Sequence, residues 1–341
     1  MNPSRHIDMS APAGIAGAPA SRGSGTGAPS PGPDPSGEPS RASAARFLVV
    51  LNPAAGGGKC GKLAPAALER LRAAHLRFDV VESRHPGHGI QIARDAFAQG
   101  YRRFVAMGGD GTACEIVNGL FPAAANQRVS LAFQPLGTGN SFLRDFSTEG
   151  LAHATRALVD DRRQPCDLIR LTHADGVLYS INLLSIGFSA DVAALTNRRF
   201  KRLGHLGYLL GVLVCLARLR RREFPLQVDA DAEIDRRRHL FLTFNNSKFT
   251  GGTMMIAPQA DTADGLVEYV RWGPIGRLGL IRSLPTLYDG THVNHPLAAR
   301  RSVRHVEFHL DAPVDVMVDG EVMTLQPRTL EVLPSALDVM V

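Results

Sequence analysis

The sequence predicts an α/β protein in two parts, a parallel sheet with helices on both faces followed by a mainly antiparallel β-sandwich. Between residues 46 and 165, short apolar runs alternate with amphipathic stretches of helical length, which is the pattern of a parallel sheet covered by helices. After residue 165, strand-like runs follow one another with turn residues between them, which indicates antiparallel pairing. Three glycine-rich loops in the first part each follow an apolar run, and open α/β sheets bind ligands at such loops.

The composition limits the classes of partner. A chain of 341 residues predicts about two domains. The net charge of +6 and the pI near 9.4 favour an anionic partner, which includes nucleotides, nucleic acids and acidic lipid surfaces. We expect no nucleic-acid partner, because aromatic residues make up only 6% of the chain and are not interleaved with the basic ones. The four cysteines show no paired spacing, so a reducing cytoplasm fits better than a disulfide framework or a zinc site.

Four segments are predicted along the chain. Residues 1–45 are rich in Ala, Gly, Pro and Ser, so we expect a disordered tail, and they lack the apolar core of an export signal. Residues 46–165 form the α/β part, residues 166–325 form the β-rich part, and residues 326–341 form a strand that could return to the first part. The longest apolar run, from Leu206, has about a dozen residues. A membrane span needs about 20, so we predict no transmembrane segment.

The elements of the α/β part follow from hydrophobic periodicity. Continuous apolar runs predict buried strands, and apolar residues spaced three and four apart predict helices. The predicted strands are FLVVLN, FDVVES, RFVAM and RVSLAFQ, and the predicted helices are KLAPAALERLRAAH, GIQIARDAFAQG and the segments TACEIVNGLF and NSFLRDF after the second and third glycine loops.

The β-rich part contains strand-like runs and two helix-like segments. The runs are mostly close together in sequence, which favours antiparallel neighbours. The predicted strands are CDLIRLTH, VLYSINLLSIGF, PLQVDAD, HLFLTFNNS, GLVEYVRW, VRHVEFHLD and VDVMVDGEVM, and the two helix-like segments are RFKRLGHLGYLLGVLVCLARLRR and IGRLGLIRSLPTLYDG.

The first glycine loop, NPAAGGGKCGKL, nearly matches the phosphate-binding P-loop pattern. Gly56, Gly61 and Lys62 have the required spacing, but the hydroxyl position is Leu63, which cannot ligate magnesium. The loop is therefore a damaged P-loop, a different phosphate loop or a simple turn.

The second loop, MGGDGTACE, carries the clearest chemical signal. Three glycines let backbone amides approach a ligand at the start of a helix, where phosphate is favoured. Asp110 lies among them, and an acidic residue there suggests a magnesium ion or a hydroxyl to be deprotonated. An alternative is that Thr112 and Glu115 form a capping box that only starts the helix. The third loop, PLGTGNSF, repeats the glycine pattern, so the loops predict a Rossmann-like ligand-binding sheet edge.

Near the C-terminus, VMVDGE supplies two carboxylates two residues apart, Asp319 and Glu321. An extended backbone would direct both side chains to one face. The alternative is ordinary hairpin-turn chemistry around the glycine.

Together these motifs resemble one family. NPAAGGGK, GGDGT, GTGN, SIGFSADV and VDGE occur in the order found in the diacylglycerol kinase catalytic-domain superfamily, which includes bacterial lipid kinases, sphingosine kinases and ceramide kinases. The resemblance covers the chain from Arg46 onward. It implies phosphoryl transfer from ATP with Mg²⁺ to a lipid hydroxyl, most simply that of diacylglycerol or a related lipid alcohol. By similarity the nucleotide site is lined by Asn52, Gly56, Ser83, Gly108, Gly109, Asp110, Gly111, Thr112 and Thr138.

The resemblance also implies roles for acidic residues. Asp319 corresponds to the general base of bacterial diacylglycerol kinases and Glu321 to its partner, while Asp110 organises magnesium and water. In sphingosine kinases the acid that matches Asp110 is described as the base, which is the alternative. Asp191 in SIGFSADV is the candidate acid on the substrate side. In some bacterial members, residues equivalent to Asp261, Asp264 and the carbonyl of Leu266 hold a structural magnesium, but a polar turn is an equal alternative.

Two departures leave the lipid acceptor open. Sphingosine kinases tend to carry an acid where this chain has Ala193, and many bacterial members have Asp where it has Ser141. The alternatives are therefore a sphingoid-base kinase, an NAD kinase sharing GGDGT, and a non-catalytic lipid- or nucleotide-binding module. The basic and apolar segment Arg198–Arg222 suggests peripheral binding of a cytoplasmic protein to the inner membrane surface, or a core helix. A homodimer is left open.

Overall fold

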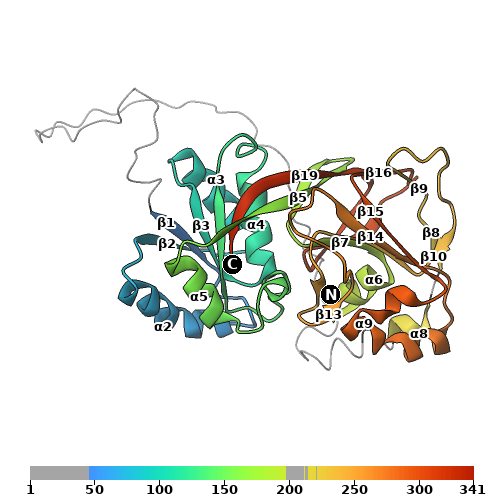
Figure 1. Cartoon of the computed structure of the whole chain (residues 1–341), viewed down its shortest axis with the longest axis horizontal. Helices are drawn as coiled ribbons and strands as arrows, with labels where there is room; N and C mark the ends of the chain where they lie inside the picture. The colour runs from blue at the N-terminus through green and yellow to red at the C-terminus, as the bar shows by residue number, and fades with distance from the viewer. Residues whose placement is uncertain (1–45, 197–210, 212–213, 220) are drawn as a thin grey trace, which may run out of the picture.

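The structure, a computed structural model, describes residues 46–196, 211, 214–219 and 221–341 (Figure 1). The predicted tail, residues 1–45, lies outside the described residues, and so does most of the segment Arg198–Arg222. None of the helices in the described residues is long and apolar enough to cross a membrane.

Four parallel strands form one end of a nine-stranded sheet, in the order β2-β1-β3-β4. Helices cover both faces of these strands, so β1 is buried along its whole length. Val50, Phe104 and Ile116 belong to the apolar core on one face, and Val49 and Leu71 to the core on the other. The elements of this part are β1 (Phe47–Leu51), α2 (Lys59–Ala73), β2 (Phe78–Glu82), α3 (His88–Ala98), β3 (Arg103–Gly108), α4 (Asp110–Leu120), β4 (Ser130–Pro135), η1 (Phe142–Asp145) and α5 (Leu151–Val159).

The last strand, β19 (Pro327–Met340), joins the two parts of the molecule. Its C-terminal end runs parallel to β4, with Asp338 opposite Ser130. Its other end pairs antiparallel with β16 (His305–Phe308), and β5 (Arg163–His173) runs antiparallel along most of it. Figure 1 shows β19 and β5 crossing together from one half to the other. The sheet is completed by β6 (Gly176–Ser180) and β9 (Leu226–Val228).

A six-stranded antiparallel sheet packs against the far end of the first sheet. One apolar cluster contains Ile169 and Leu330 from the first sheet together with Ile186 and Phe244 from the second, so the two sheets form a sandwich. This arrangement confirms the predicted fold class. The strand order is β15 (Ala298–Val303), β14 (Val267–Trp272), β11 (Phe241–Asn245), β7 (Leu183–Gly187), β17 (Val314–Val318) and β18 (Glu321–Leu325).

Short helices cover the outer face of the second sheet. The buried side chains of Trp272, Leu280 and Leu287 belong to the core beneath them. These elements are α6 (Phe188–Leu195), α8 (Arg277–Ser283), α9 (Thr286–Asp289) and η4 (Thr291–Asn294), and short strand pairs are formed by β8 (Arg222–Glu223) with β10 (Arg238–His239) and by β12 (Phe249–Thr250) with β13 (Met254–Met255).

The structure differs from the sequence prediction at several places, and two of them bear on the site. The run VLYSINLLSIGF was predicted as one strand, but it forms β6 in one sheet and β7 in the other. At the break, the backbone amides of Ile181 and Asn182 turn to the carboxylate of Asp319 instead of continuing a ladder. After the third glycine loop the chain makes only the 3-10 helix η1 before α5 begins.

Candidate active site

The three glycine loops meet at the carboxyl ends of the parallel strands. The loop after β4 packs backbone to backbone on the loop after β3, because a Cβ on Gly137 would lie 2.5 Å from the Cα of Gly109. The amide of Gly137 donates to the carbonyl of Gly108 at 2.7 Å. In the first loop, Gly56 has a φ of +64°, and a Cβ there would lie 3.2 Å from the carbonyl oxygen of Leu136. These contacts require glycine, and they place backbone groups from three loops side by side.

The first and second loops are also linked by side chains. Asn52, directly after β1, donates from Nδ2 to Oγ1 of Thr112 at 3.3 Å. Thr112 lies inside α4, which begins at Asp110, and no side chain caps that helix. The capping-box alternative for Thr112 is therefore wrong. Lys59 and Lys62 belong to α2 and are exposed, and Leu63 is exposed in the same helix.

Glu115 is a residue whose contribution the sequence did not reveal. Its two carboxylate oxygens accept hydrogen bonds from the amides of Gly87 and Gly89, each at 2.8 Å. These glycines lie at the start of α3, where free amides and the helix dipole favour a negative charge. Glu115 therefore ties α4 to the loop that contains Ser83, which is buried and donates its amide to the carbonyl of Leu51 at 2.8 Å.

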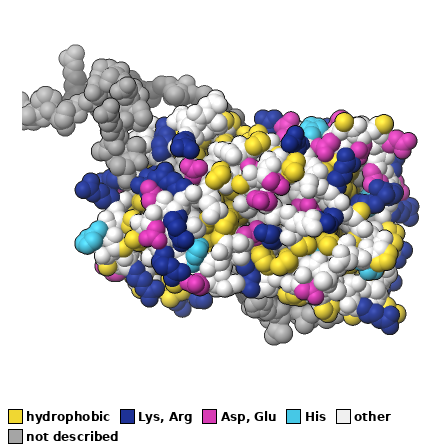
Figure 2. Space-filling model, in the orientation of Figure 1, with side chains coloured by type: hydrophobic (Ala, Val, Ile, Leu, Met, Phe, Trp, Pro, Cys, Tyr) yellow, Lys and Arg dark blue, Asp and Glu magenta, His cyan; other side chains and the backbone are white. Residues whose placement is uncertain are grey.

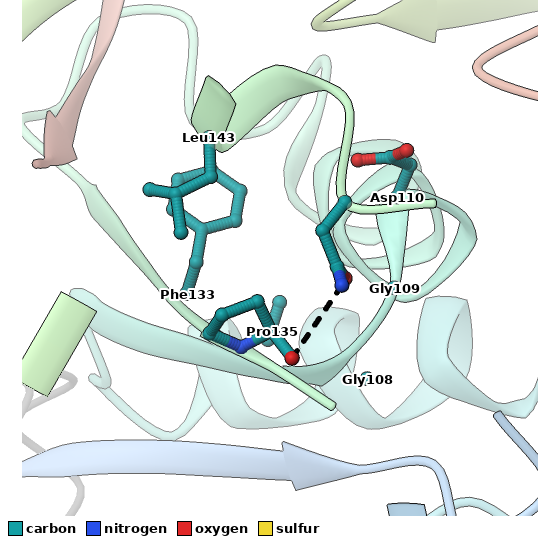
Figure 3. Close-up of a pocket in the computed structure, with 8 residues that line it drawn as sticks. Gly108, Gly109, Asp110, Phe133, Pro135 and Leu143 are labelled. Atoms are coloured by element: carbon teal, nitrogen blue, oxygen red, sulfur yellow. Dashed lines mark hydrogen bonds between the residues drawn. The ribbon is translucent and has the colours of Figure 1, made fainter. Parts of the chain in front are cut away.

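Asp110 is held by the third loop. Its Oδ2 accepts the amide of Ser141 at 2.8 Å, and its Oδ1 accepts that of Phe142 at 3.3 Å. Burial raises the pKa of Asp110, the hydrogen bonds from Ser141 and Phe142 lower it, and the nearby charge of Asp319 raises it. Figure 3 shows a pocket at this point, where Asn140 Nδ2 donates to the carbonyl oxygen of Pro135 at 3.4 Å. The pocket is lined by Ala106, Gly108, Gly109, Asp110, Phe133, Pro135, Asn140 and Leu143.

Asp319 reaches this region from the other half of the molecule. It occupies the tight turn between β17 and β18 with a φ of +47°, so the backbone between Asp319 and Glu321 is a hairpin turn and not the extended strand that was expected. Yet Asp319 is only 3% exposed. Burial raises its pKa, whereas its hydrogen bonds lower it. The donors are the Ser180 hydroxyl (2.5 Å) and the amides of Ile181 (3.1 Å), Asn182 (3.0 Å) and Leu183 (3.0 Å).

Glu321 follows the same turn and lies over the second glycine loop. A Cβ built on Gly111 would be 3.4 Å from Oε1 of Glu321. Asp319 and Glu321 therefore both reach the start of α4, although they approach it from a hairpin turn. The charges of both acids also raise the pKa of the buried Cys114 thiol, after burial itself.

Ser141 and Asp145 connect the third loop to the β-rich half. The Ser141 hydroxyl accepts the amide of Gly252 at 2.9 Å. Asp145 accepts the amide of Lys248 at 3.0 and 3.1 Å, and the Lys248 ammonium lies 3.8 Å from the same carboxylate. Burial raises the pKa of Asp145 to about 6 despite these partners.

Two predicted residues, Thr138 and Asp191, lie apart from this cluster or contribute little contact to it. Thr138 is exposed at the tip of the third loop. Asp191 lies on α6, and its Oδ2 accepts a hydrogen bond from Nη2 of Arg222 at 2.5 Å. Within the described residues, no hydrogen bond or ion pair joins Asp191 to Asp110 or Asp319.

In the loop predicted to hold a structural magnesium, two acids make local turn hydrogen bonds and a third, buried acid lies beside them. Exposed Asp261 and Asp264 accept the amides of Ala263 (3.0 Å) and Leu266 (2.9 Å). Asp167 is fully buried, and burial raises its pKa, with the charges of Asp264 and Asp261 adding to the shift. In the part of the chain that the structure describes, no three His, Cys, Asp or Glu side chains are arranged to hold a metal ion.

A glycine edge of the nucleotide-binding type with buried carboxylates from both halves is typical of a phosphotransferase, and comparison with known proteins gives its class as lipid kinase. The diacylglycerol kinase catalytic domain model matches residues 46–171, and the YegS C-terminal NAD kinase beta sandwich-like domain model matches residues 182–341. The chain belongs to the family of diacylglycerol kinases and YegS-like lipid kinases, as the resemblance predicted.

Individual relatives cover most of the chain. A diacylglycerol kinase of Mycobacterium tuberculosis is 29% identical over 313 residues, which are 89% of this chain and 98% of the relative. A probable YegS-like lipid kinase of Pseudomonas aeruginosa is 31% identical over 276 residues, 80% of this chain and 88% of the relative. A crystal structure of a putative diacylglycerol kinase from Bacillus anthracis has a TM-score of 0.69 and 21% identity, covering 87% of this chain and 95% of that one.

Proposed function

We propose that this lipid kinase transfers the γ-phosphate of ATP, with Mg²⁺, to the hydroxyl of diacylglycerol or a related lipid alcohol. The observation that carries the proposal is that Asp110 and Asp319 lie within electrostatic range of each other. The two carboxylates come from different halves of the chain, and they lie close enough for the charge of one to raise the pKa of the other. Acids with perturbed pKa values beside a phosphate-type glycine loop are characteristic of catalytic sites.

In the proposed reaction, the lipid hydroxyl oxygen forms a bond to the γ-phosphorus while the bond from that phosphorus to the β–γ bridging oxygen breaks, and ADP leaves. Asp319 accepts the hydroxyl proton. Its Oδ1 is held by Ser180, Asn182 and Leu183, and its Oδ2 by the amide of Ile181. Four donors fix the carboxylate in one orientation, which is what a general base needs.

The nucleotide is proposed to lie on the three glycine loops, where backbone amides and the start of α4 favour phosphate. Asn52 and Thr112 fix the first two loops relative to each other. Glu115 fixes the Ser83 loop. The proposed nucleotide-contacting residues are Asn52, Gly56, Ser83, Gly108, Gly109, Gly111, Thr112 and Thr138.

We propose Mg²⁺ at two groups of oxygen atoms, because this ion prefers carboxylate and carbonyl oxygens. At the active site Asp110 is the proposed ligand and Glu321 lies over the next residue, Gly111. A bound Mg²⁺ would neutralise phosphate charge. The charge of Asp319 raises the pKa of Asp110, a repulsion that a cation would relieve. The second group is Asp261, Asp264 and the Leu266 carbonyl. There the charges of Asp264 and Asp261 raise the pKa of the neighbouring Asp167, and a cation would relieve this repulsion as well.

A lipid alcohol is favoured over a sphingoid base by the state of Asp191. An acceptor ammonium needs an unpaired acid, but Asp191 is already paired with Arg222, and the position two residues on is Ala193. NAD remains the alternative acceptor, because the second half matches a sandwich described as NAD kinase-like.

The test is transfer of labelled γ-phosphate from ATP to diacylglycerol, a sphingoid base and NAD, with the lipids presented in mixed micelles. The proposal expects label in diacylglycerol. Label in NAD alone would assign an NAD kinase, label in the sphingoid base alone would change the acceptor, and ATP binding without any transfer would leave a binding module.

A further inference from the structure

The outer side of α8 and α9 exposes large apolar side chains. Leu278 is 72% exposed, Ile281 is 47% exposed and Tyr288 is 57% exposed. Leu278 and Ile281 are three residues apart, so they share one face of α8. The opposite side of the same helices is already packed, because Leu280 and Leu287 belong to the buried core. The exposed side chains therefore contribute little to that core, and an exposed apolar group of this kind indicates an interaction site.

Exposed arginines lie on the same helix and in the segment held beside it. Arg282 is exposed on α8, and Arg218 is exposed in the preceding segment. Arg277 donates from Nε and Nη2 to the carbonyls of Leu216 (3.1 Å) and Ala217 (3.0 Å), so that segment is held beside the start of α8. We call Leu278, Ile281 and Tyr288, with Arg218, Arg277 and Arg282, the α8–α9 surface.

The charge of the α8–α9 surface is positive. Residues 274–288 contain no Asp or Glu, and the only acid of α8 and α9 is Asp289. Its carboxylate is occupied by the amide and hydroxyl of Thr291, at 2.9 and 2.6 Å. Where Figure 1 places α8 and α9, Figure 2 shows hydrophobic and basic side chains together on the molecular surface.

We propose that the α8–α9 surface docks the protein onto an anionic bilayer, a role that rests on the proposed function because a lipid kinase must reach an acceptor held in a membrane. Apolar side chains enter the boundary between headgroups and acyl chains, and adjacent arginines bind anionic headgroups. A second copy of this chain fits less well, because a twofold contact would bring the same arginines together.

The experiment compares full-length protein on vesicles of phosphatidylcholine alone and of phosphatidylcholine mixed with phosphatidylglycerol, by co-sedimentation. The variants are Leu278→Ser with Ile281→Ser, and Arg282→Glu alone. The matched control is Val159→Ser, which is also 47% exposed but lies on α5 in the other half. None of these residues belongs to the proposed catalytic or nucleotide machinery.

The proposal expects wild type and the Val159→Ser control to bind the anionic vesicles more tightly than the neutral ones. The double serine variant should bind both kinds about tenfold more weakly, because apolar burial is lost. Arg282→Glu should weaken binding to the anionic vesicles at least about fivefold, from the value of one basic residue near such a surface. Phosphorylation of a short-chain, water-soluble diacylglycerol should be unchanged in all variants.

Two results would overturn the proposal. One is vesicle binding by the double serine variant equal to that of the control. The other is a wild-type oligomer that becomes a monomer in the double variant, because the surface would then be an interface between copies. Failure of the proposed function would give a different result, because the wild-type protein would then phosphorylate neither the water-soluble diacylglycerol nor lipid in a membrane. Co-sedimentation with vesicles does not depend on turnover, so it tests the docking surface separately.

Discussion

The carboxylate of Asp110 accepts the backbone amide of Ser141 at 2.8 Å, while the hydroxyl of the same Ser141 accepts the amide of Gly252 at 2.9 Å. One residue thus holds an acid of the glycine-loop half and a loop of the β-rich half. Asp110 and Asp319 come from these two halves, so their relative position depends on such links.

Replacing Ser141 by Ala removes the acceptor for the Gly252 amide but keeps the backbone amide that binds Asp110. A partly buried donor left without a partner costs about 1–3 kcal/mol, so we expect the free energy of unfolding to fall by that amount and kcat to fall with it. Chemical denaturation and initial rates measure both. Ser147→Ala is the control, because Ser147 makes a similar bond to Glu149 on the exposed surface. Equal effects of the two variants would exclude a link through Ser141.

Asp319→Asn tests the general base. The amide cannot take up the proton, so turnover should fall by about 10²–10⁴-fold. It should also destabilise the fold by about 1–3 kcal/mol, because one NH₂ group now faces backbone donors. Rates corrected for the folded fraction, with ATP binding measured separately, distinguish the two effects. Turnover near the wild-type value would remove Asp319 from the chemistry.

Glu115→Gln tests the link between α4 and the Ser83 loop. Glutamine keeps one acceptor for Gly87 or Gly89 and loses the charge at the start of α3. Because the nucleotide contacts this loop in our proposal, KM for ATP should rise by about 10-fold, from the value of one charged hydrogen bond, with a smaller change in kcat. An unchanged KM for ATP would show that the link is structural only.

The buried His239 ring should make the free energy of unfolding fall at acid pH. Burial lowers its pKa from 6.5 to about 4, so the unfolded state binds the proton more readily and the native state prefers the neutral ring. The neutral ring therefore contributes its full share of the unfolding free energy above pH 6.5. This share is lost as the pH falls through 4, and the total loss is at most about 3 kcal/mol. The difference in unfolding free energy between wild type and His239→Phe, followed over that range, measures it. Parallel pH dependences for the two proteins would contradict the assignment.

The first half of the fold was predictable because its signals are local. Each strand from β1 to β4 is a short run of sequence bounded by helix or turn residues, and the carboxyl ends of parallel strands share an edge. The meeting of the Gly56, Gly109 and Gly137 loops therefore follows from the pattern alone. The role predicted for Asp110, in binding magnesium or deprotonating a hydroxyl, followed from the unusual position of an acid among three glycines.

The environment of Asp319 was not predictable, because its hydrogen-bond partners are distant in sequence. Ser180 and Asp319 are 139 residues apart, and their contact exists only because a predicted single strand breaks into β6 and β7. A hairpin motif such as Asp319-Gly320 usually indicates an exposed turn. The local sequence therefore gives no sign that the Asp319 side chain is buried. Glu115 was similarly hidden, since its spacing from Thr112 suggested a helix cap.

The central claim is that Asp110 and Asp319 act as one catalytic unit, and a double-mutant cycle of kcat for transfer from ATP to diacylglycerol tests it most directly. Asp110→Asn, Asp319→Asn and the double variant are compared at equal folded fraction. Residues that act as a unit are strongly non-additive, so the double variant should be no slower than the slower single one by more than a few-fold. Losses that multiply, or near-normal turnover in either single variant, would contradict the claim.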